Sequence, residues 1–237
     1  MKISAALLAF GLAAVAVLAE PAKLRVLVLT GGHGFAREPF FRMFQDNPGI
    51  DFTAIEHTKD TADGWERADL AAADVVVLYD MPPVISPAQQ ERMRSLFVRG
   101  TGLVVLHHAL VTEHGWPGYE AIVGGAYPVK GAPGAQAAGY RHDVTIPVVI
   151  ANRGHPITAG LADFTVQDEI YWGYRVGADV TPLLTTTHPE SGKPLAWCRN
   201  EGKSRVVYLQ LGHGPSCFGN PSYREFLARA LRWAAGR

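Results

Sequence analysis

Three hydrophobic segments of this chain each run directly into a histidine that stands beside small residues. They are residues 24–32 before His33, residues 103–106 before His107 and His108, and residues 206–212 before His213. Segments so rich in Val and Leu are typical of strands buried on both faces of a parallel sheet. Ligands of open α/β sheets bind beyond the carboxyl ends of the strands. If these strands are neighbours, four of the nine histidines of the chain lie at one edge of the sheet.

Strands and helices alternate through the first half of the chain. The pattern predicts strands at 24–30, 51–57, 74–79 and 103–106, with helices at 37–45, 65–73 and 87–98 between them. Ser86, Pro87 and Gln89 form a helix-start signature, because Ser is a preferred N-cap and Gln can complete a capping box. This alternation predicts an α/β fold with a doubly wound, mostly parallel sheet and helices on both faces.

The second half of the chain departs from this alternation. The predicted elements are a short helix at 116–123, a Gly- and Pro-rich loop at 127–139, strands at 142–150, 182–187, 194–198 and 206–211, and an amphipathic helix at 223–235. The last two strands are expected to form a hairpin. Segment 164–174 mixes acidic and aromatic residues. The length and composition predict one domain with an elaborated second half.

The first 19 residues predict a cleavable secretory signal. Lys2 precedes a continuous apolar run, 3–18, and Ala19 supplies a small residue at the cleavage position. An uncleaved membrane anchor is the alternative, since the run is only slightly shorter than a spanning helix. Cleavage would leave residues 20–237 as a periplasmic or secreted domain without stable membrane insertion.

Several classes of partner and cofactor are not expected. The formal net charge is zero, whereas a nucleic-acid-binding surface needs clustered Lys and Arg. Gly32-His33-Gly34 opens a helix as a dinucleotide-binding turn would, but Arg37 occupies the third small position, so no nucleotide cofactor is expected. Export would allow Cys198 and Cys217 to pair, although two unpaired thiols are favoured because the spacing does not establish disulfide geometry.

The candidate catalytic residues are His107, His213, Asp168 and Glu169. Imidazoles beside a carboxylate can serve as general acids and bases or as metal ligands. Neighbouring residues on a strand point to opposite faces, so only one of His107 and His108 is expected to line the site. An exposed charged turn is the alternative for Asp168 and Glu169.

Substrate contacts are predicted for His33, His108, Tyr127 and Tyr171. The imidazoles could bind substrate oxygens, and sugars stack on tyrosine rings, although packing in the core is the alternative for an aromatic ring. His33, His107 and His213, with one of the two acidic residues, are also acceptable ligands for zinc or another divalent ion. No short signature such as HExxH is present, so these ligands would come from distant segments. The alternative for each histidine is a turn residue without a functional role, either exposed to water or hydrogen-bonded within the protein.

Four longer segments carry a family resemblance. They are LRVLVLTGGHGF, GTGLVVLHHAL, HPITAGLADFTVQDEIY and PLAWCRNEGKSRVVYLQLGHGPSCFGNPSYREFLARALRW. The sequence resembles the ThuA-like, or trehalose utilisation, proteins of the class I glutamine amidotransferase-like superfamily, whose fold is flavodoxin-like. The resemblance implies a scaffold that has lost the catalytic cysteine, with His107 or His108 at the elbow and His213 in the place of the amidotransferase histidine. Glutamine amidotransferase activity is therefore not expected.

The resemblance also implies a role in the catabolism of trehalose or of oxidised keto-sugars. Two functions stay open. One is a sugar-modifying hydrolase, isomerase or lyase that uses the histidines and a carboxylate, with or without a divalent metal. The other is a non-catalytic sugar-binding or accessory protein on a scaffold without its nucleophile. In both, the expected partner is a small-molecule sugar, and a homo-oligomer is compatible with the sequence.

Overall fold

The computed structural model describes residues 22–58, 61–81, 84–111, 116–128 and 137–237. The predicted signal segment 1–19 and the centre of the predicted loop 127–139 lie outside these ranges. Within them, no helix is both long enough and apolar enough to cross a membrane.

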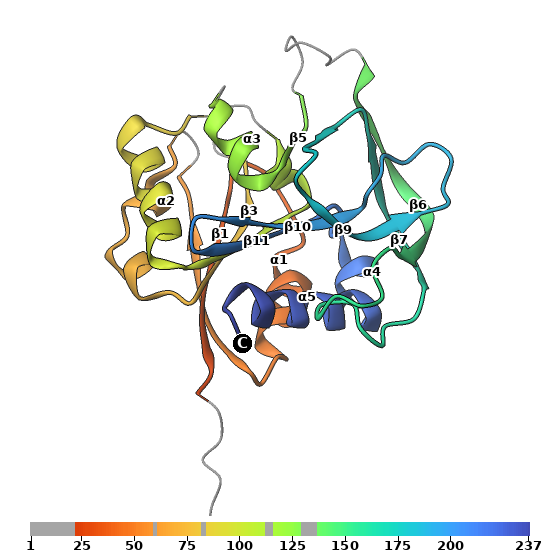
Figure 1. Ribbon diagram of the computed structural model, residues 1–237, viewed down its shortest axis with the longest axis horizontal. Coiled ribbons are helices and arrows are strands. Elements are labelled where there is room, and N and C mark those ends of the chain that lie inside the picture. The colour runs from red at the N-terminus through yellow and green to blue at the C-terminus, as the bar shows by residue number, and fades with distance from the viewer. Residues whose placement is uncertain (1–21, 59–60, 82–83, 112–115, 129–136) are drawn as a thin grey trace, which may run out of the picture.

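A single large sheet runs through the described part of the chain (Figure 1). Its strand order is β2-β1-β3-β4-β11-β10-β9-β6-β7. Its parallel half contains β1 (Leu24–Gly31), β2 (Ile50–Glu56), β3 (Val75–Asp80), β4 (Gly102–Leu106) and β11 (Ser204–Leu209). Its antiparallel half contains β10 (Ala196–Glu201), β9 (Thr181–Thr186), β6 (Gly139–Ile150) and β7 (Phe164–Trp172). A separate pair joins β5 (Gly125–Ala126) to β8 (Arg175–Val176).

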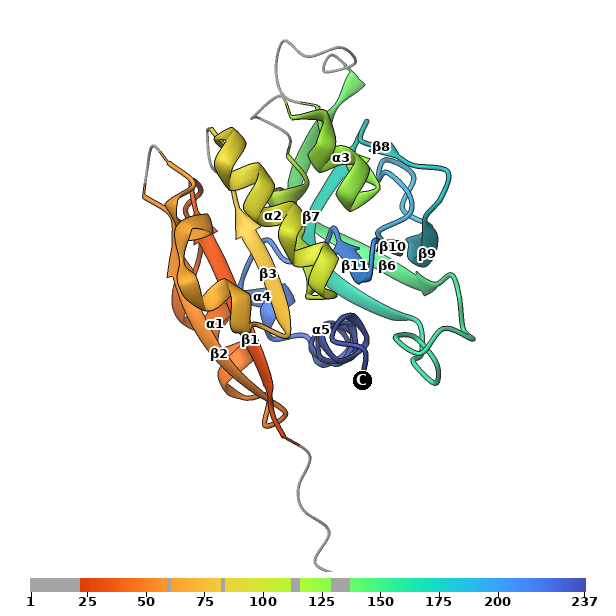
Figure 2. The same ribbon diagram turned by 60° about the vertical axis from the view of Figure 1, so that its left-hand side comes forward.

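Helices cover both faces of this sheet (Figure 2). One apolar core lies under α1 (Arg37–Gln45), α4 (Pro215–Phe218) and α5 (Pro221–Ala234), and the other lies under α2 (Pro87–Arg99) and α3 (Pro117–Val123). Strands β3 and β4 are buried at every position because both cores contact them. The predicted α/β fold with helices on both faces is confirmed.

Local signals place most of the helix boundaries correctly. The Ser86 hydroxyl accepts from the Gln89 amide and the Gln89 side chain accepts from the Ser86 amide, so the predicted capping box forms at the start of α2.

The predicted helix at 65–73 is wrong. Two 3-10 segments, Asp63–Glu66 and Ala68–Ala72, stand there instead, because Arg67 adopts an extended backbone (ψ 135°) and pairs locally with Asp69.

Cys198 and Cys217 are both buried and free. The favoured expectation of two unpaired thiols is therefore correct. Burial raises the pKa of Cys198 to about 11, and burial with the neighbouring Asp168 carboxylate raises the pKa of Cys217. Both cysteines are therefore protonated thiols at neutral pH.

Candidate functional site

The histidine-tipped strands do meet at one edge of the sheet, although they are not all adjacent. Strand β4 pairs with β11, whereas β3 lies between β1 and β4. His107 and His213 therefore follow neighbouring strands, and His33 follows a strand two positions away.

His107 turns sharply out of β4 into a 3-10 segment, His107–Leu110, with φ at 52°. This left-handed conformation is uncommon for a residue with a side chain and typical of the tight turn that presents a nucleophile in α/β hydrolases. The buried ring donates from Nδ1 to the Gln210 carbonyl at 2.7 Å. In the neutral ring, Nε2 is consequently the nitrogen without a proton, and its lone pair faces the cluster described next.

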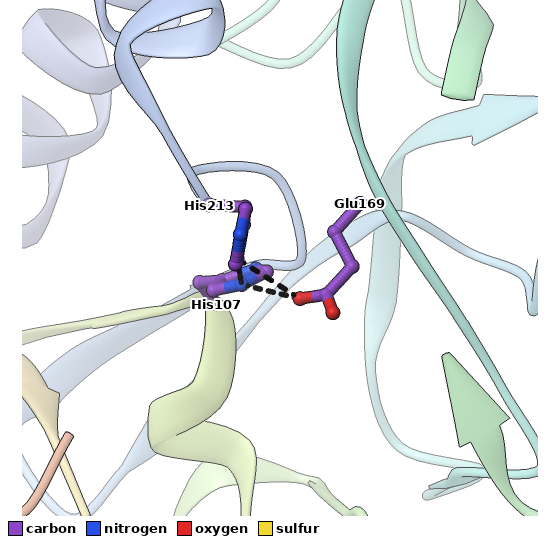
Figure 3. Close-up of side chains that lie close together, drawn as sticks. All are labelled: His107, Glu169 and His213. Carbon is purple, nitrogen blue, oxygen red and sulfur yellow. Dashed lines mark hydrogen bonds and ion pairs between the residues drawn. The ribbon is translucent and has the colours of Figure 1, made fainter. Parts of the chain in front are cut away.

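Glu169 on β7 joins His107 and His213 into one cluster (Figure 3). The Glu169 Oε2 atom lies 2.9 Å from His107 Nε2 and 3.3 Å from His213 Nδ1. The two ring nitrogens lie 3.3 Å apart. Three segments far apart in the sequence thus direct one electron-pair donor each towards a common point.

The charge of Glu169 is maintained by its neighbours. Burial opposes ionisation of this carboxylate, but hydrogen bonds and charge interactions with His107 and His213 outweigh burial and hold the pKa of Glu169 well below its usual range. The hydrogen bond with Glu169 in turn raises the pKa of His213. The cluster is therefore built around a permanent negative charge at neutral pH.

Asp168 precedes Glu169 on β7 and has a different task. Its carboxylate accepts the backbone N–H of Gly212 at 2.6 Å and that of His213 at 2.9 Å. Both acidic side chains are buried, so the alternative of an exposed charged turn is wrong. The structure places Asp168 against the backbone of the His213 loop, where it fixes the position of the imidazole.

His142 was not selected from the sequence. The pairing of β6 with β7 shifts register between Arg141 and Val144, and Asp143 has φ at 56°. This bulge places His142 Nδ1 3.2 Å from Glu169 Oε1 and its ring 4.5 Å from that of His213. Bulges often redirect a side chain next to an active site, but the sequence of a bulge carries no periodic signal.

His33 and His108 form a second pair of rings beside the cluster. Their centroids lie 4.5 Å apart in a stacked arrangement. His108 is buried without a hydrogen bond to either ring nitrogen, and burial followed by the charges of His107 and His33 lowers its pKa well below the ordinary value. Among the described residues, the group that could hold a metal contains His107, Glu169 and His213, so His33 lies outside the ligand set expected for it.

Two predicted aromatic residues also reach the cluster. The Tyr171 hydroxyl lies 2.9 Å from His107 Nε2, and its ring stacks on that of His107 at 4.9 Å. Tyr127 packs against Tyr171 at 5.2 Å. The Gln210 side chain donates to the Glu169 backbone carbonyl, and the Gln210 backbone carbonyl accepts from His107 Nδ1, so one buried residue holds two members of the cluster.

The cluster has the dimensions of a metal site. In a tetrahedral zinc site with bonds of about 2.0–2.1 Å, neighbouring ligand atoms lie about 3.3 Å apart. The three separations in the cluster are 2.9, 3.3 and 3.3 Å. Two imidazoles and one carboxylate are ordinary zinc ligands, and three protein ligands leave a fourth position for water or substrate. Donation of Nδ1–H to a carbonyl, as in His107, is the usual support for a metal-binding histidine.

Comparison with known proteins identifies the fold and the family of this chain. No curated protein matches the sequence. A ThuA-like protein from Parabacteroides merdae shares the fold with a TM-score of 0.74 at 19% identity, over 90% of each chain. A ThuA-like protein from Bacteroides uniformis shares it with a TM-score of 0.67 at 21% identity, over 94% of this chain and 95% of the other.

The fold also occurs within larger enzymes. A β-galactosidase from Rahnella sp. R3 matches with a TM-score of 0.61 at 15% identity, over 90% of this chain but 31% of its own. At such identity the likeness concerns the fold alone. The sequence model of the ThuA family, described as trehalose utilisation, matches residues 25–234. The chain therefore belongs to the ThuA, or trehalose utilisation, family.

Proposed function

We propose that this protein is a metal-assisted enzyme of carbohydrate catabolism whose active site is the cluster of His107, Glu169 and His213. The observation that carries the proposal is the convergence of three electron-pair donors at 2.9–3.3 Å from one another. Because His107 Nδ1 donates to Gln210, its Nε2 carries a proton only as imidazolium. A divalent cation satisfies all three donors at once.

In this proposal, different residues would bind the metal, transfer protons and position the ligands. A divalent ion held by the three ligands would supply Lewis-acid polarisation of a carbonyl or hydroxyl oxygen. Tyr171 and His142 flank the ligands at 2.9 and 3.2 Å, and each can hold or move a proton at its hydroxyl or Nδ1. Asp168 and Gln210 keep the imidazoles in place. Such groups suit a proton shift or elimination next to a sugar carbonyl, and also hydrolysis.

Family membership supports a carbohydrate as the substrate, and we propose trehalose-related sugars or keto-sugars as its class. The elbow residue His107 cannot replace the cysteine nucleophile of glutamine hydrolysis, which argues against that activity. With the predicted signal segment removed, the enzyme would meet these sugars in the periplasm or outside the cell. Sequencing the N-terminus of the protein secreted by its host tests the export step.

Metal analysis tests the proposal most directly. Untagged protein, equilibrated with zinc and dialysed, should retain about one zinc ion per chain, because structural and catalytic zinc sites bind tightly. Glu169→Gln and His213→Ala should lose the ion, and the matched control His188→Ala should keep it, since His188 lies outside the cluster and its ring accepts the backbone N–H of nearby Glu190. Wild-type protein without stoichiometric metal in zinc, manganese, cobalt or nickel would refute the proposal.

Turnover distinguishes the enzyme from a binding protein. Sugars and their keto derivatives are incubated with metal-loaded protein and followed by nuclear magnetic resonance. Product should form with wild type and His188→Ala and fail to form with His213→Ala at equal folded concentration. If sugars bind with unchanged structure and none is converted, the non-catalytic function holds instead.

A further inference from the structure

The ribbon formed by β6 and β7 carries three rings beside the cluster, those of Tyr140, His142 and Tyr171. These three residues are called the wall. Tyr140 pairs with Tyr171 across the two strands, and residues that pair directly in an antiparallel sheet share one face. Tyr171 uses that face to contact His107. Tyr140 therefore lies on the face that is directed to the cluster, but nearer the open end of the ribbon, where it is 59% exposed.

Ring contacts continue from the cluster out to this exposed tyrosine. The His142 ring lies 4.5 Å from the His213 ring, and the Tyr140 ring meets His142 edge to face at 5.3 Å. On the other side of Glu169, Tyr127 packs on Tyr171.

Among the described residues 137–143, the wall does not provide a free cation. Arg141 forms an ion pair with Glu190, and the exposed charge that remains in the stretch 140–143 is the carboxylate of Asp143. This part of the described surface therefore disfavours a phosphorylated or carboxylated ligand and favours a neutral one.

We propose that Tyr127, Tyr140 and His142 form a subsite for a neutral pyranose ring, next to a sugar unit held at the metal cluster. The proposal rests on the function proposed above and assigns to these three residues the recognition of a second sugar ring. A pyranose has an apolar C–H face and a hydroxylated edge, which suits an aromatic ring flanked by a tyrosine hydroxyl and an imidazole. Exposure of Tyr140 is explained because its partner is the substrate.

Isothermal titration with matched sugars tests the subsite. The probes are glucose, which has one ring, and trehalose, maltose and cellobiose, which each have two. At least one disaccharide should bind wild-type protein about 3- to 10-fold more tightly than glucose, the gain expected of one aromatic stack. Tyr140→Ala should abolish this preference without changing the affinity for glucose, and Tyr140→Trp should keep it.

Val98→Ala is the matched control, because Val98 is also an exposed apolar residue but belongs to α2. It should leave both affinities unchanged. Equal affinities of wild type for one-ring and two-ring sugars, or a preference that survives Tyr140→Ala, would overturn the subsite. So would the absence of any saccharide binding at millimolar concentration. None of these results alters the metal content, so the metal site and the subsite can fail separately.

Discussion

Replacing Asp168 by Asn tests how the fold holds the central histidine loop. The carboxylate accepts two backbone N–H groups, from Gly212 at 2.6 Å and from His213 at 2.9 Å, within the protein interior. Hydrogen bonds to a charged group contribute about 1.5–3 kcal/mol each, and a buried donor left unsatisfied costs about 1–3 kcal/mol. Asn removes the charge and turns an amide NH₂ towards one of the two donors. The free energy of unfolding should fall by about 2–4 kcal/mol.

The same substitution should also weaken metal binding, because the loop carries a ligand. Loss of a group that orients a metal ligand typically lowers affinity about 10- to 100-fold. Urea unfolding measures the stability, and competition with a zinc chelator measures the affinity.

Asp163→Asn is the control for this substitution. Asp163 also accepts a backbone N–H, that of Ile150 at 2.9 Å, but its side chain is 47% exposed. It should therefore lose less than about 1 kcal/mol. If the two variants lose equal stability, or if Asp168→Asn binds zinc like wild type, the role assigned to Asp168 is incorrect.

Three further predictions concern other parts of the molecule. Below pH 6.5 the raised pKa of His213 stabilises the metal-free fold, and this stabilisation is lost as pH rises through the folded pKa. The difference in unfolding free energy between wild type and His213→Ala should therefore fall as the pH rises above about 6.5, and a constant difference would contradict the pairing. Cys198 and Cys217 should not react with a thiol reagent in folded protein and should both react in urea, because burial keeps them protonated; rapid labelling of the native state would contradict this. Gly32→Ala should destabilise by about 2–4 kcal/mol, since its φ is +74° and a Cβ atom would lie 2.0 Å from a carbonyl oxygen, whereas Gly34→Ala meets open space and should cost less than about 1 kcal/mol. Equal stability of the two glycine variants in urea would show that the turn adjusts freely.

The parallel half of the sheet was predictable because its signals are local. Buried strands such as β4 read as unbroken runs of Val and Leu, and a cap such as Ser86 fixes where α2 begins. Parallel strands that alternate with helices end at one edge, so the meeting of His107 with His213 follows from their positions in the sequence. That inference also required β4 and β11 to be neighbours, which the structure shows.

The antiparallel half was less predictable because it depends on distant pairing. Residues 164–174 showed acidic and aromatic side chains but no clear element, and the structure makes most of them the edge strand β7. The alternation of side chains along that strand sends Asp168 to the backbone of the loop and Glu169 to the imidazoles. Neither role can be assigned until the partner of the strand is known, and His142 requires in addition the register shift opposite it.

Each half of the sheet has a residue with a strained backbone, within or directly after a strand, and each of these residues positions a histidine of the site. Among the described residues, the non-glycine positions with positive φ are His107 at 52° and Asp143 at 56°. A left-handed conformation costs such residues about 1–2 kcal/mol, so it persists only where the surrounding structure enforces it. One strained residue turns the His107 ring out of β4, and the other displaces β6 so that His142 reaches Glu169. Regular strands would direct both imidazoles elsewhere. The strain therefore falls at the two places where strand geometry conflicts with assembly of the site, which is the expected distribution if the site and not the core determines these backbones.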